Sequence, residues 1–429
     1  FLTRGVQPRV YAIEESNNIN RAQLDCLGAD LSDIEKNAAK MQLNGLLDAL
    51  KDAKEYGSIL TVDNYDWELL RRYTASPDAD GQISMEYIGI EQTTEQLQNL
   101  IDIGEAMAQK YDAVVTNPPY MGASGMGAGL SKYVKEKYPD SKSDLFAVFM
   151  ERCEKFIANN RYQAMITQHA WMFLSSFEKF RTKLLSSNDI STMVHLGARA
   201  FEEIGGEVVQ TTSFILKKGT VKNYKGKYCR LIAPVTQYGK EKMFLEKENR
   251  YSSEQANFSK IPGSPVAYWV SEKMLNAFEN GTLLGNIADS KQGLATTDNK
   301  RFLRIWSEID YNKIIYNVDS INNAIKSGGK WFPYNKGGEF RKWFGNNEYI
   351  VNYENDGKEI KSSVLKKYPY LKTPEFVVKN TNYYFKKCIS WSLISSSVAA
   401  FRYKPLGFIF DVAGMSCFAT EDKLLYLLA

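Results

Sequence analysis

The most restrictive feature of this sequence is the alternation of short apolar runs with amphipathic helical segments between residues 93 and 216. Alternating strands and helices are typical of an α/β domain, in which helices pack on a sheet. The spacing therefore predicts a largely parallel sheet, with an antiparallel edge formed by its last two, closely spaced strands. The predicted strands are residues 112–116, 162–167, 192–196 and 211–216, and the predicted helices are residues 93–110, 144–159 and 177–185.

Upstream of this region, the pattern predicts one more strand and one more helix. Residues 9–14, Arg-Val-Tyr-Ala-Ile-Glu, indicate a short buried strand. A helix is expected over residues 33–56, because their apolar residues recur at helical spacing. The apolar face predicted for this helix consists of Ile34, Ala38, Met41, Leu46, Leu47 and Leu50.

Charge is divided unevenly along the 429-residue chain, which is long enough for two or three domains. Residues 1–216 hold 21 lysines and arginines against 30 acidic residues, whereas residues 217–429 hold 33 against 20. The basic part also contains 34 of the 55 aromatic residues. This distribution indicates a module for chemistry joined to a module that grips a polyanion, although solvated surface lysines would produce the same counts.

Four residues, Asn117-Pro118-Pro119-Tyr120, follow the predicted strand at 112–116, and we call them the tetrad. Because prolines end strands, a simple turn is one interpretation. In the chemical interpretation, the Asn117 amide oxygen and the Pro118 carbonyl accept hydrogen bonds from an exocyclic amine, and the Tyr120 ring stacks on the planar group. Two such bonds push the amine toward tetrahedral geometry and free its lone pair for methyl transfer. Ligands of α/β sheets bind at such strand ends.

The tetrad at a strand end resembles the signature of S-adenosylmethionine-dependent amino-methyltransferases. Further segments resemble the parts that follow this signature in those enzymes and the target-recognition domain of large adenine-specific DNA methyltransferases. These segments are residues 143–152, 162–167, 195–201, 291–302, 331–343 and 391–397. Their order is most similar to the PglX family, the methyltransferases of bacteriophage-exclusion (BREX) systems, which are related to fused restriction-modification enzymes.

The resemblance implies an α/β, Rossmann-like methyltransferase domain, truncated at its N-terminus, followed by a mixed α+β target-recognition domain. We expect the partial catalytic domain at 1–218, a linker region at 219–263 and a partial recognition domain at 264–429. The family's glycine-rich cofactor motif, D-P-A-C-G-S-G, is absent, and we expect it upstream of Phe1. The glycine-rich stretch at 124–129 lacks the lysine of a phosphate-binding loop, so it is expected to be a loop over the active site or a plain connection.

The resemblance also implies roles for individual residues. The predicted catalytic residues are Asn117, Pro118, Pro119 and Tyr120. A flipped adenine is expected to be stacked by Tyr120 and Phe201. The cofactor, S-adenosylmethionine, is expected to contact Glu15, Asp144, Leu145 and Phe149, and DNA is expected to contact Lys291, Lys300, Arg301 and Arg304. A core position for Phe201 and a surface position for Glu15 remain open as alternatives.

The implied function is site-specific methylation of adenine N6 in double-stranded DNA, in phage defence and restriction-modification, together with other proteins of the defence system. Two alternatives stay open: an amino-methyltransferase acting on RNA or on protein glutamine, and a DNA-recognition module that is not catalytic by itself. Five scattered cysteines and two histidines indicate no disulfide framework, no metal centre and a cytoplasmic protein. His195, in an apolar stretch, is expected to be a core or strand-end residue. No apolar run reaches the ~18 residues of a membrane span.

Overall fold

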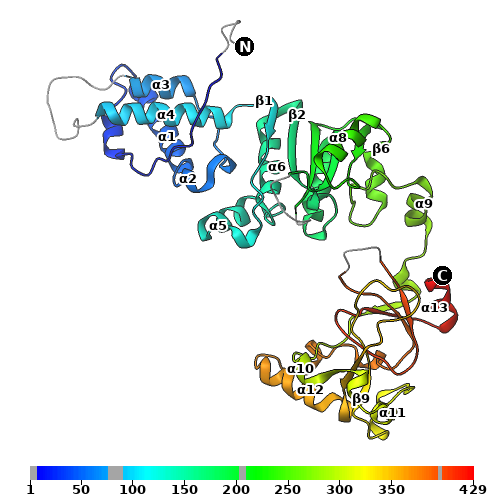
Figure 1. The fold of residues 1–429 in the computed structure, drawn as a ribbon. Helices are drawn as coiled ribbons and strands as arrows, with labels where there is room; N and C mark the ends of the chain where they lie inside the picture. The colour runs from blue at the N-terminus through cyan, green and yellow to red at the C-terminus, as the bar shows by residue number, and fades with distance from the viewer. Residues whose placement is uncertain (1–6, 76–89, 202–208, 395–398) are drawn as a thin grey trace. The chain divides into compact units, whose positions relative to one another are not determined.

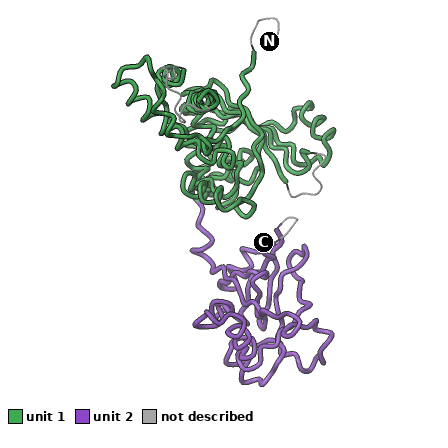
Figure 2. The backbone as a smooth tube through the Cα atoms, turned by 90° about the vertical axis from the view of Figure 1, so that its left-hand side faces the viewer, with its two compact units in different colours: residues 1–280 green, residues 281–429 purple. Residues whose placement is uncertain are grey.

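The computed structural model of the protein describes residues 7–75, 90–201, 209–394 and 399–429. The chain forms two compact units, Phe1–Asn280 and Gly281–Ala429, which Figure 2 shows in different colours. The division falls after residue 280, whereas the sequence placed the beginning of the second domain at residue 264. We refer to these as unit 1 and unit 2.

Unit 1 begins with a group of helices (Figure 1). These helices are α1 (Asp33–Ala49), α2 (Ala53–Tyr56), α3 (Trp67–Ala75) and α4 (Ile90–Ala108). Ser32 caps α1 by accepting from the Glu35 backbone, while the Glu35 carboxylate accepts from the Ser32 N–H, a capping box that starts the helix. Helix–helix packing then buries a continuous core of aliphatic side chains from all four helices.

The buried face of α1 differs from the predicted one at two positions. Leu46, Leu47 and Leu50 are fully buried as expected, but Ile34 and Met41 are 83% and 73% exposed. The residues that complete the buried face are Ala39 and Leu43. The predicted strand at 9–14 was also wrong: these residues are irregular and Val10 is 89% exposed. Its apolar residues find no partner strand in the described structure, and a strand without one leaves its backbone groups unpaired.

The helices lead into a six-stranded sheet in the order β1-β2-β4-β3-β5-β6. The strands are β1 (Tyr111–Thr116), β2 (Ile157–Gln168), β3 (Asn188–Ala198), β4 (Gln210–Lys218), β5 (Lys225–Arg230) and β6 (Arg250–Glu254). Only β1–β2 and β3–β5 pair in parallel, so the sheet is mixed rather than largely parallel. The β3–β4 pair is antiparallel as predicted, but it is central, because β4 inserts between β2 and β3. Consequently β1, β2, β3 and β5 point in one direction.

Helices α6 (Leu145–Phe156) and α7 (Glu178–Ser187) connect β1 to β2 and β2 to β3. Their apolar side chains share one core with the sheet. From the helices come Phe146 and Phe180, and from the strands come Met165, Met193 and Phe214, each at most 3% exposed. Packing of helices on a sheet through such a core confirms the α/β class. Helix α5 (Ala128–Lys137) begins within the glycine-rich stretch at 124–129, so the last two residues of the predicted loop are helical.

The predicted linker at 219–263 is part of the fold. It contributes β5 and β6 to the sheet, together with α8 (Gln237–Glu246), and α9 (Glu272–Asn280) follows. Tyr228 and Phe258 are 2% and 1% exposed, so the segment also contributes to the core. Its short elements and many lysines had suggested a linker, but β5, a strand that alternates buried and exposed residues, has the same composition.

Unit 2 mixes short strands and helices, as predicted for an α+β domain. It has two four-stranded sheets, ordered β13-β9-β10-β8 and β12-β11-β14-β7. The strands are β7 (Asp289–Lys291), β8 (Leu303–Ile305), β9 (Trp331–Asn335), β10 (Tyr349–Asn352), β11 (Cys388–Ser390), β12 (Arg402–Lys404), β13 (Ile409–Phe410) and β14 (Ser416–Phe418). The helices are α10 (Asn299–Phe302), α11 (Ile321–Lys326), α12 (Glu354–Lys367) and α13 (Glu421–Leu428). An aromatic-rich core includes Phe332, Tyr334 and Phe385, all fully buried.

Candidate active site at the edge of the sheet

The tetrad lies directly beyond the carboxyl end of β1, where Thr116 pairs with Met165 of β2. Asn117 is exposed, and no described residue forms a hydrogen bond with its side chain. Pro118 is buried and Pro119 is exposed. The structure therefore presents a free amide at a strand end while its neighbour is anchored in the protein.

The residues after the tetrad are tied to the start of α6. The Met121 N–H donates to the Asp144 carboxylate at 3.0 Å, and the Leu145 N–H donates to the Met121 carbonyl at 3.0 Å. Asp144 also caps α6 by accepting from the Phe146 N–H at 3.3 Å. Burial raises the pKa of the Asp144 carboxyl, whereas these backbone bonds oppose the rise. One carboxylate thus joins the tetrad to the helix.

Tyr120 is held at both its hydroxyl and its ring. Its hydroxyl donates to the Ile166 carbonyl of β2 at 3.3 Å. Its ring meets Phe146 edge-on, with centroids 6.3 Å apart and planes at 85°. Burial raises the pKa of the phenol to about 12, so it stays neutral at physiological pH. The half-buried ring forms part of the rim of the core, at the same edge as Asn117.

The predicted cofactor residues fall into two places. Asp144, Leu145 and Phe149 lie together at the start of α6, beside the tetrad. Leu145 is only 5% exposed and packs in the core with Val134 and other residues, whereas Phe149 is half-buried. Glu15 lies elsewhere, beside the α1–α4 helices, where the N–H of the next residue donates to the Leu50 carbonyl at 3.1 Å.

Phe201 lies just beyond the end of β3 and is half-buried. Because β1 and β3 point in one direction, Phe201 and the tetrad come from the same edge of the sheet. No ring contact between Phe201 and Tyr120 occurs among the described residues. The two predicted stacking residues therefore lie at the same edge of the sheet. That their rings face each other remains a prediction.

The same edge holds two neighbouring histidines, His169 and His195, of which the sequence analysis considered only His195. His195 is 3% exposed on β3, which confirms it as a core residue. Its Nε2 lies 2.8 Å from Nδ1 of His169, and its Nδ1 lies 3.3 Å from the Tyr268 hydroxyl. Burial, reinforced by nearby positive groups, lowers the pKa of His195 to about 3, and burial lowers that of His169. No spacing signal connects these residues, which are joined only by the fold.

The four predicted DNA-contacting residues lie in unit 2 but on different sheets. Lys291 is in β7 and pairs with Asp289 at 3.1 Å. Lys300 and Arg301 are in α10, which precedes Arg304 in β8. Arg301 pairs with Glu359 at 2.7 Å, and Arg304 donates to the Lys300 carbonyl at 2.7 Å. The structure therefore places Lys300, Arg301 and Arg304 together, whereas Lys291 lies in the other sheet.

Comparison with known proteins finds similarity to methyltransferases. A model of the family described as the Eco57I restriction-modification methylase matches residues 25–201. The adenine-specific methyltransferase PglX of Lacticaseibacillus casei (strain Zhang) is 42% identical over 397 residues, 90% of this chain and 32% of that protein. The adenine-specific methyltransferase BrxX of Escherichia coli O9:H4 (strain HS) is 38% identical over 376 residues, 86% of this chain and 29% of that protein. Over most of its length, the chain is therefore similar to adenine-specific methyltransferases of the PglX family.

The chain spans about a third of the length of these two PglX-family relatives. Among solved structures, the type IIL restriction-modification enzyme MmeI in complex with DNA aligns with a TM-score of 0.49 and 12% identity, over 96% of this chain and 60% of that one.

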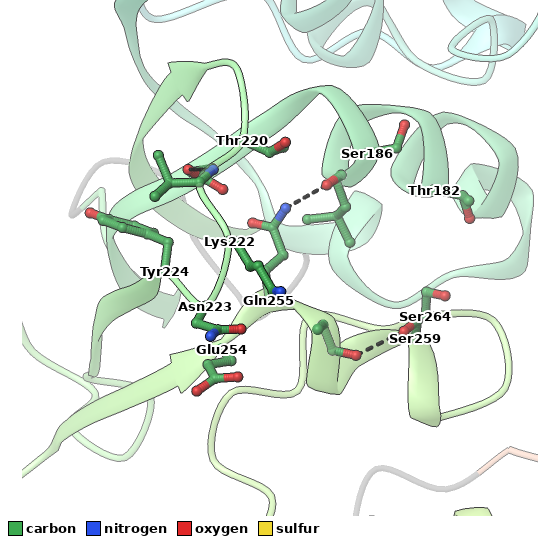
Figure 3. A pocket seen from close by; sticks show the side chains of 14 residues that line it. Thr182, Ser186, Thr220, Lys222, Asn223, Tyr224, Glu254, Gln255, Ser259 and Ser264 are labelled. Atoms are coloured by element: carbon green, nitrogen blue, oxygen red, sulfur yellow. Dashed lines mark hydrogen bonds between the residues drawn. The ribbon is translucent and has the colours of Figure 1, made fainter.

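A cavity in unit 1 lies away from the tetrad. It has a volume of about 640 Å³ and is lined by residues such as Thr182, Tyr224 and Glu254 (Figure 3). These residues come from α7 and from the ends of β5 and β6 that face away from the carboxyl ends of β1 and β3. The cavity is therefore separate from the candidate active site.

Two further observations concern the described residues alone. No group of three or more histidine, cysteine, aspartate or glutamate side chains there could hold a metal ion. None of the described helices is both long enough and apolar enough to cross a membrane.

Proposed function

We propose that this chain is the methyl-transferring and DNA-recognising part of a site-specific adenine DNA methyltransferase of phage defence. The substrate is N6 of a flipped-out adenine in double-stranded DNA, and the methyl donor is S-adenosylmethionine. The observation that carries the proposal is the exposed, unpartnered Asn117 amide beside a buried Pro118 at the end of β1. The names of the PglX-family relatives, both adenine-specific methyltransferases, support the same substrate.

The tetrad supplies acceptors for the target amine. Asn117 Oδ1 and the Pro118 carbonyl accept the two N6 hydrogens, which directs the nitrogen lone pair away from the protein backbone. The prolines restrict the chain, and the Met121 bonds to α6 hold its far end, so these acceptors are preorganised. Fixed acceptors stabilise the positive charge that develops on N6 during transfer. Bound S-adenosylmethionine supplies the electrophilic methyl group.

Two of the predicted cofactor residues, Asp144 and Phe149, have groups suited to contact the adenine of S-adenosylmethionine. Asp144 uses Oδ1 for both of its backbone bonds, which leaves Oδ2 to accept from an adenine amino group. Phe149 is half-buried, so part of its ring can pack on a planar base. Leu145, 5% exposed, supports these groups from the core. We assign the cofactor's adenine end to Asp144 and Phe149.

The substrate assignment also rests on charge. Adenine inside a duplex cannot reach the tetrad, so it must be flipped out and held by stacking. Unit 1 has 33 basic and 36 acidic residues, whereas unit 2 has 21 basic and 14 acidic residues. A basic, aromatic-rich second unit favours DNA over a protein glutamine, because phosphate contacts supply most of the affinity for nucleic acid.

Asn117→Ala in the full-length protein tests this proposal. Loss of a positioned acceptor is expected to lower DNA methylation at least ~10²-fold, while affinity for DNA stays the same. Incorporation of a labelled methyl group into DNA measures the first quantity, and a DNA-binding titration measures the second. Asn99→Ala, an exposed amide of α4, is the matched control and is expected to be neutral. Near-normal methylation by Asn117→Ala would contradict the proposal.

A further inference from the structure

The loop between β9 and β10 exposes three large aromatic side chains. Phe340, Trp343 and Phe344 are 50%, 53% and 63% exposed. We call residues 340–344 the aromatic loop. Single exposed apolar residues are common on proteins, but a contiguous group marks a surface that meets another molecule. The loop therefore requires a partner.

A buried lysine holds the end of the aromatic loop. Lys404 of β12 is completely buried, and its Nζ donates to the Gly345 carbonyl at 2.8 Å and the Asn346 carbonyl at 2.9 Å. It also donates to the side-chain oxygen of Asn347. Burial, together with the nearby Arg402 guanidinium, lowers the pKa of Lys404 to about 7. Burying an amine is unfavourable unless its donors are satisfied, and here the loop satisfies them.

The middle of the loop is fixed through its backbone. The Trp343 N–H donates to the Phe401 carbonyl at 2.9 Å, and the Tyr403 N–H donates to the Trp343 carbonyl at 2.9 Å. Trp343 has a φ of +70°, a left-handed conformation that is unfavourable for a bulky residue. Arg402, 1% exposed, donates from Nη1 to the Arg341 carbonyl at 3.4 Å. Strain retained in a well-anchored loop is typical of a functional surface.

Charge identifies the partner of the loop. Arg341 and Lys342, both exposed, stand between Phe340 and the Trp343–Phe344 pair. Glu339 precedes the loop in sequence, and the Glu348 carboxylate lies 3.6 Å from the Arg341 guanidinium. Unit 2 as a whole has seven more basic than acidic residues. Cations flanked by aromatic rings complement a nucleic acid, because the cations pair with phosphates and the rings pack on bases that are unstacked.

We propose that the aromatic loop contacts DNA, with Phe340, Trp343 and Phe344 wedging against base faces at an unstacked base step and Arg341 and Lys342 holding adjacent phosphates. The inference rests on the proposed function, because it takes the substrate to be DNA. It assigns the base contacts to a loop anchored by the buried side chains of Lys404 and Arg402, and not to the basic residues around α10.

The test compares DNA affinity in the full-length protein, with mixed-sequence linear duplex as the probe, across a salt series. Phe340→Ala with Phe344→Ala is expected to weaken binding about 5- to 150-fold for each ring that packs on a base. The salt slope stays unchanged, because stacking releases no counterions. Arg341→Ala with Lys342→Ala is expected to reduce the log–log salt slope by up to ~2. Phe376→Ala with Tyr370→Ala, 67% and 78% exposed, is the matched control.

Lys404→Met provides a second variant that removes no exposed group. If this variant unfolds in one cooperative transition and still loses affinity for DNA, anchoring by Lys404 is needed for binding. Unchanged affinity in a folded Lys404→Met would overturn the claim that the anchoring matters. Unchanged affinity in the Phe340/Phe344 variant, or an equal loss in the control variant, overturns the inference. Methyl transfer is not part of this readout, so failure here and failure of Asn117→Ala to lose methylation are separate results.

Discussion

At the scale of single residues, the ring and the hydroxyl of Tyr120 have separate tasks. The hydroxyl bonds to the Ile166 carbonyl and orients the side chain, whereas the ring borders the edge where Asn117 lies. A ring that stacks on the flipped base therefore predicts different outcomes for two substitutions. Tyr120→Phe keeps the ring and loses only the orienting bond, while Tyr120→Ala loses both.

We expect Tyr120→Ala to weaken capture of an extruded base by ~1–3 kcal/mol and Tyr120→Phe to have a much smaller effect. The fluorescence of 2-aminopurine at the target position measures extrusion. Phe201→Ala is expected to match Tyr120→Ala if the two rings enclose the base. A fluorescence signal that none of these changes alters would identify both rings as core residues.

The histidine pair predicts a pH dependence of stability. Burial lowers the pKa of His195 to about 3, whereas an unfolded imidazole titrates near ~6.5. Below this value the unfolded chain binds a proton that the folded protein excludes, so the free energy of unfolding falls as pH falls toward 3. The slope reaches about 1.4 kcal/mol per pH unit for one such group.

His195→Gln removes this titration and is expected to flatten the decline between pH ~6.5 and ~4.5. Denaturant unfolding of both proteins across this range measures it. Carboxylates also titrate there, but they are common to both proteins, so the difference reports His195 together with its contact to His169. Parallel pH profiles would show that the folded protein accommodates the charged imidazole.

At the scale of elements, the start of α6 both begins the helix and holds the segment that follows the tetrad. Asp144 caps α6 and also accepts from Met121, so one side chain positions the tetrad on the helix. A strand end followed by two prolines has no backbone ladder of its own to hold it. The hydrogen bonds between Met121 and the start of α6 therefore hold this segment in place of strand pairing.

Asp144→Ala is expected to lower the free energy of unfolding by about 1 kcal/mol through loss of the cap. It is also expected to reduce methylation, because the segment after the tetrad loses its anchor. Asp144→Asn keeps an oxygen that accepts both bonds and should retain most of the stability. Thermal unfolding of the two variants tests the effect on stability, and equal stability of Ala and Asn would contradict it. Methylation is expected to fall in both, because Asn has no second oxygen to accept from the cofactor's adenine amino group.

At the scale of the whole molecule, the charge difference between the units predicts where DNA phosphates are held. Lys300 and Arg301 stand on α10, although Arg301 is paired with Glu359 in the absence of DNA. Replacing both with alanine is expected to reduce the log–log salt slope of DNA binding by up to roughly 2. Lys51→Ala with Lys54→Ala in unit 1, two exposed lysines, is expected to leave the slope as it is. Equal slopes for all three proteins would place α10 outside the DNA interface.

The sequence alone determined the features that depend on local chemistry. Helices α4, α6 and α7 and strands β1 to β4 were predicted close to their observed positions, because apolar periodicity reflects which face of an element is buried. The tetrad could be identified for a similar reason: an amide, two prolines and an aromatic ring have distinctive chemistry wherever a strand ends.

The tertiary structure alone decided which elements become neighbours. The insertion of β4 between β2 and β3, and the addition of β5 and β6 to the sheet, depend on pairing between strands far apart in the chain. The contact between His169 and His195, and the anchoring of the aromatic loop by Lys404, likewise join distant residues. Local periodicity describes one element at a time, whereas these contacts arise from the packing of several elements together.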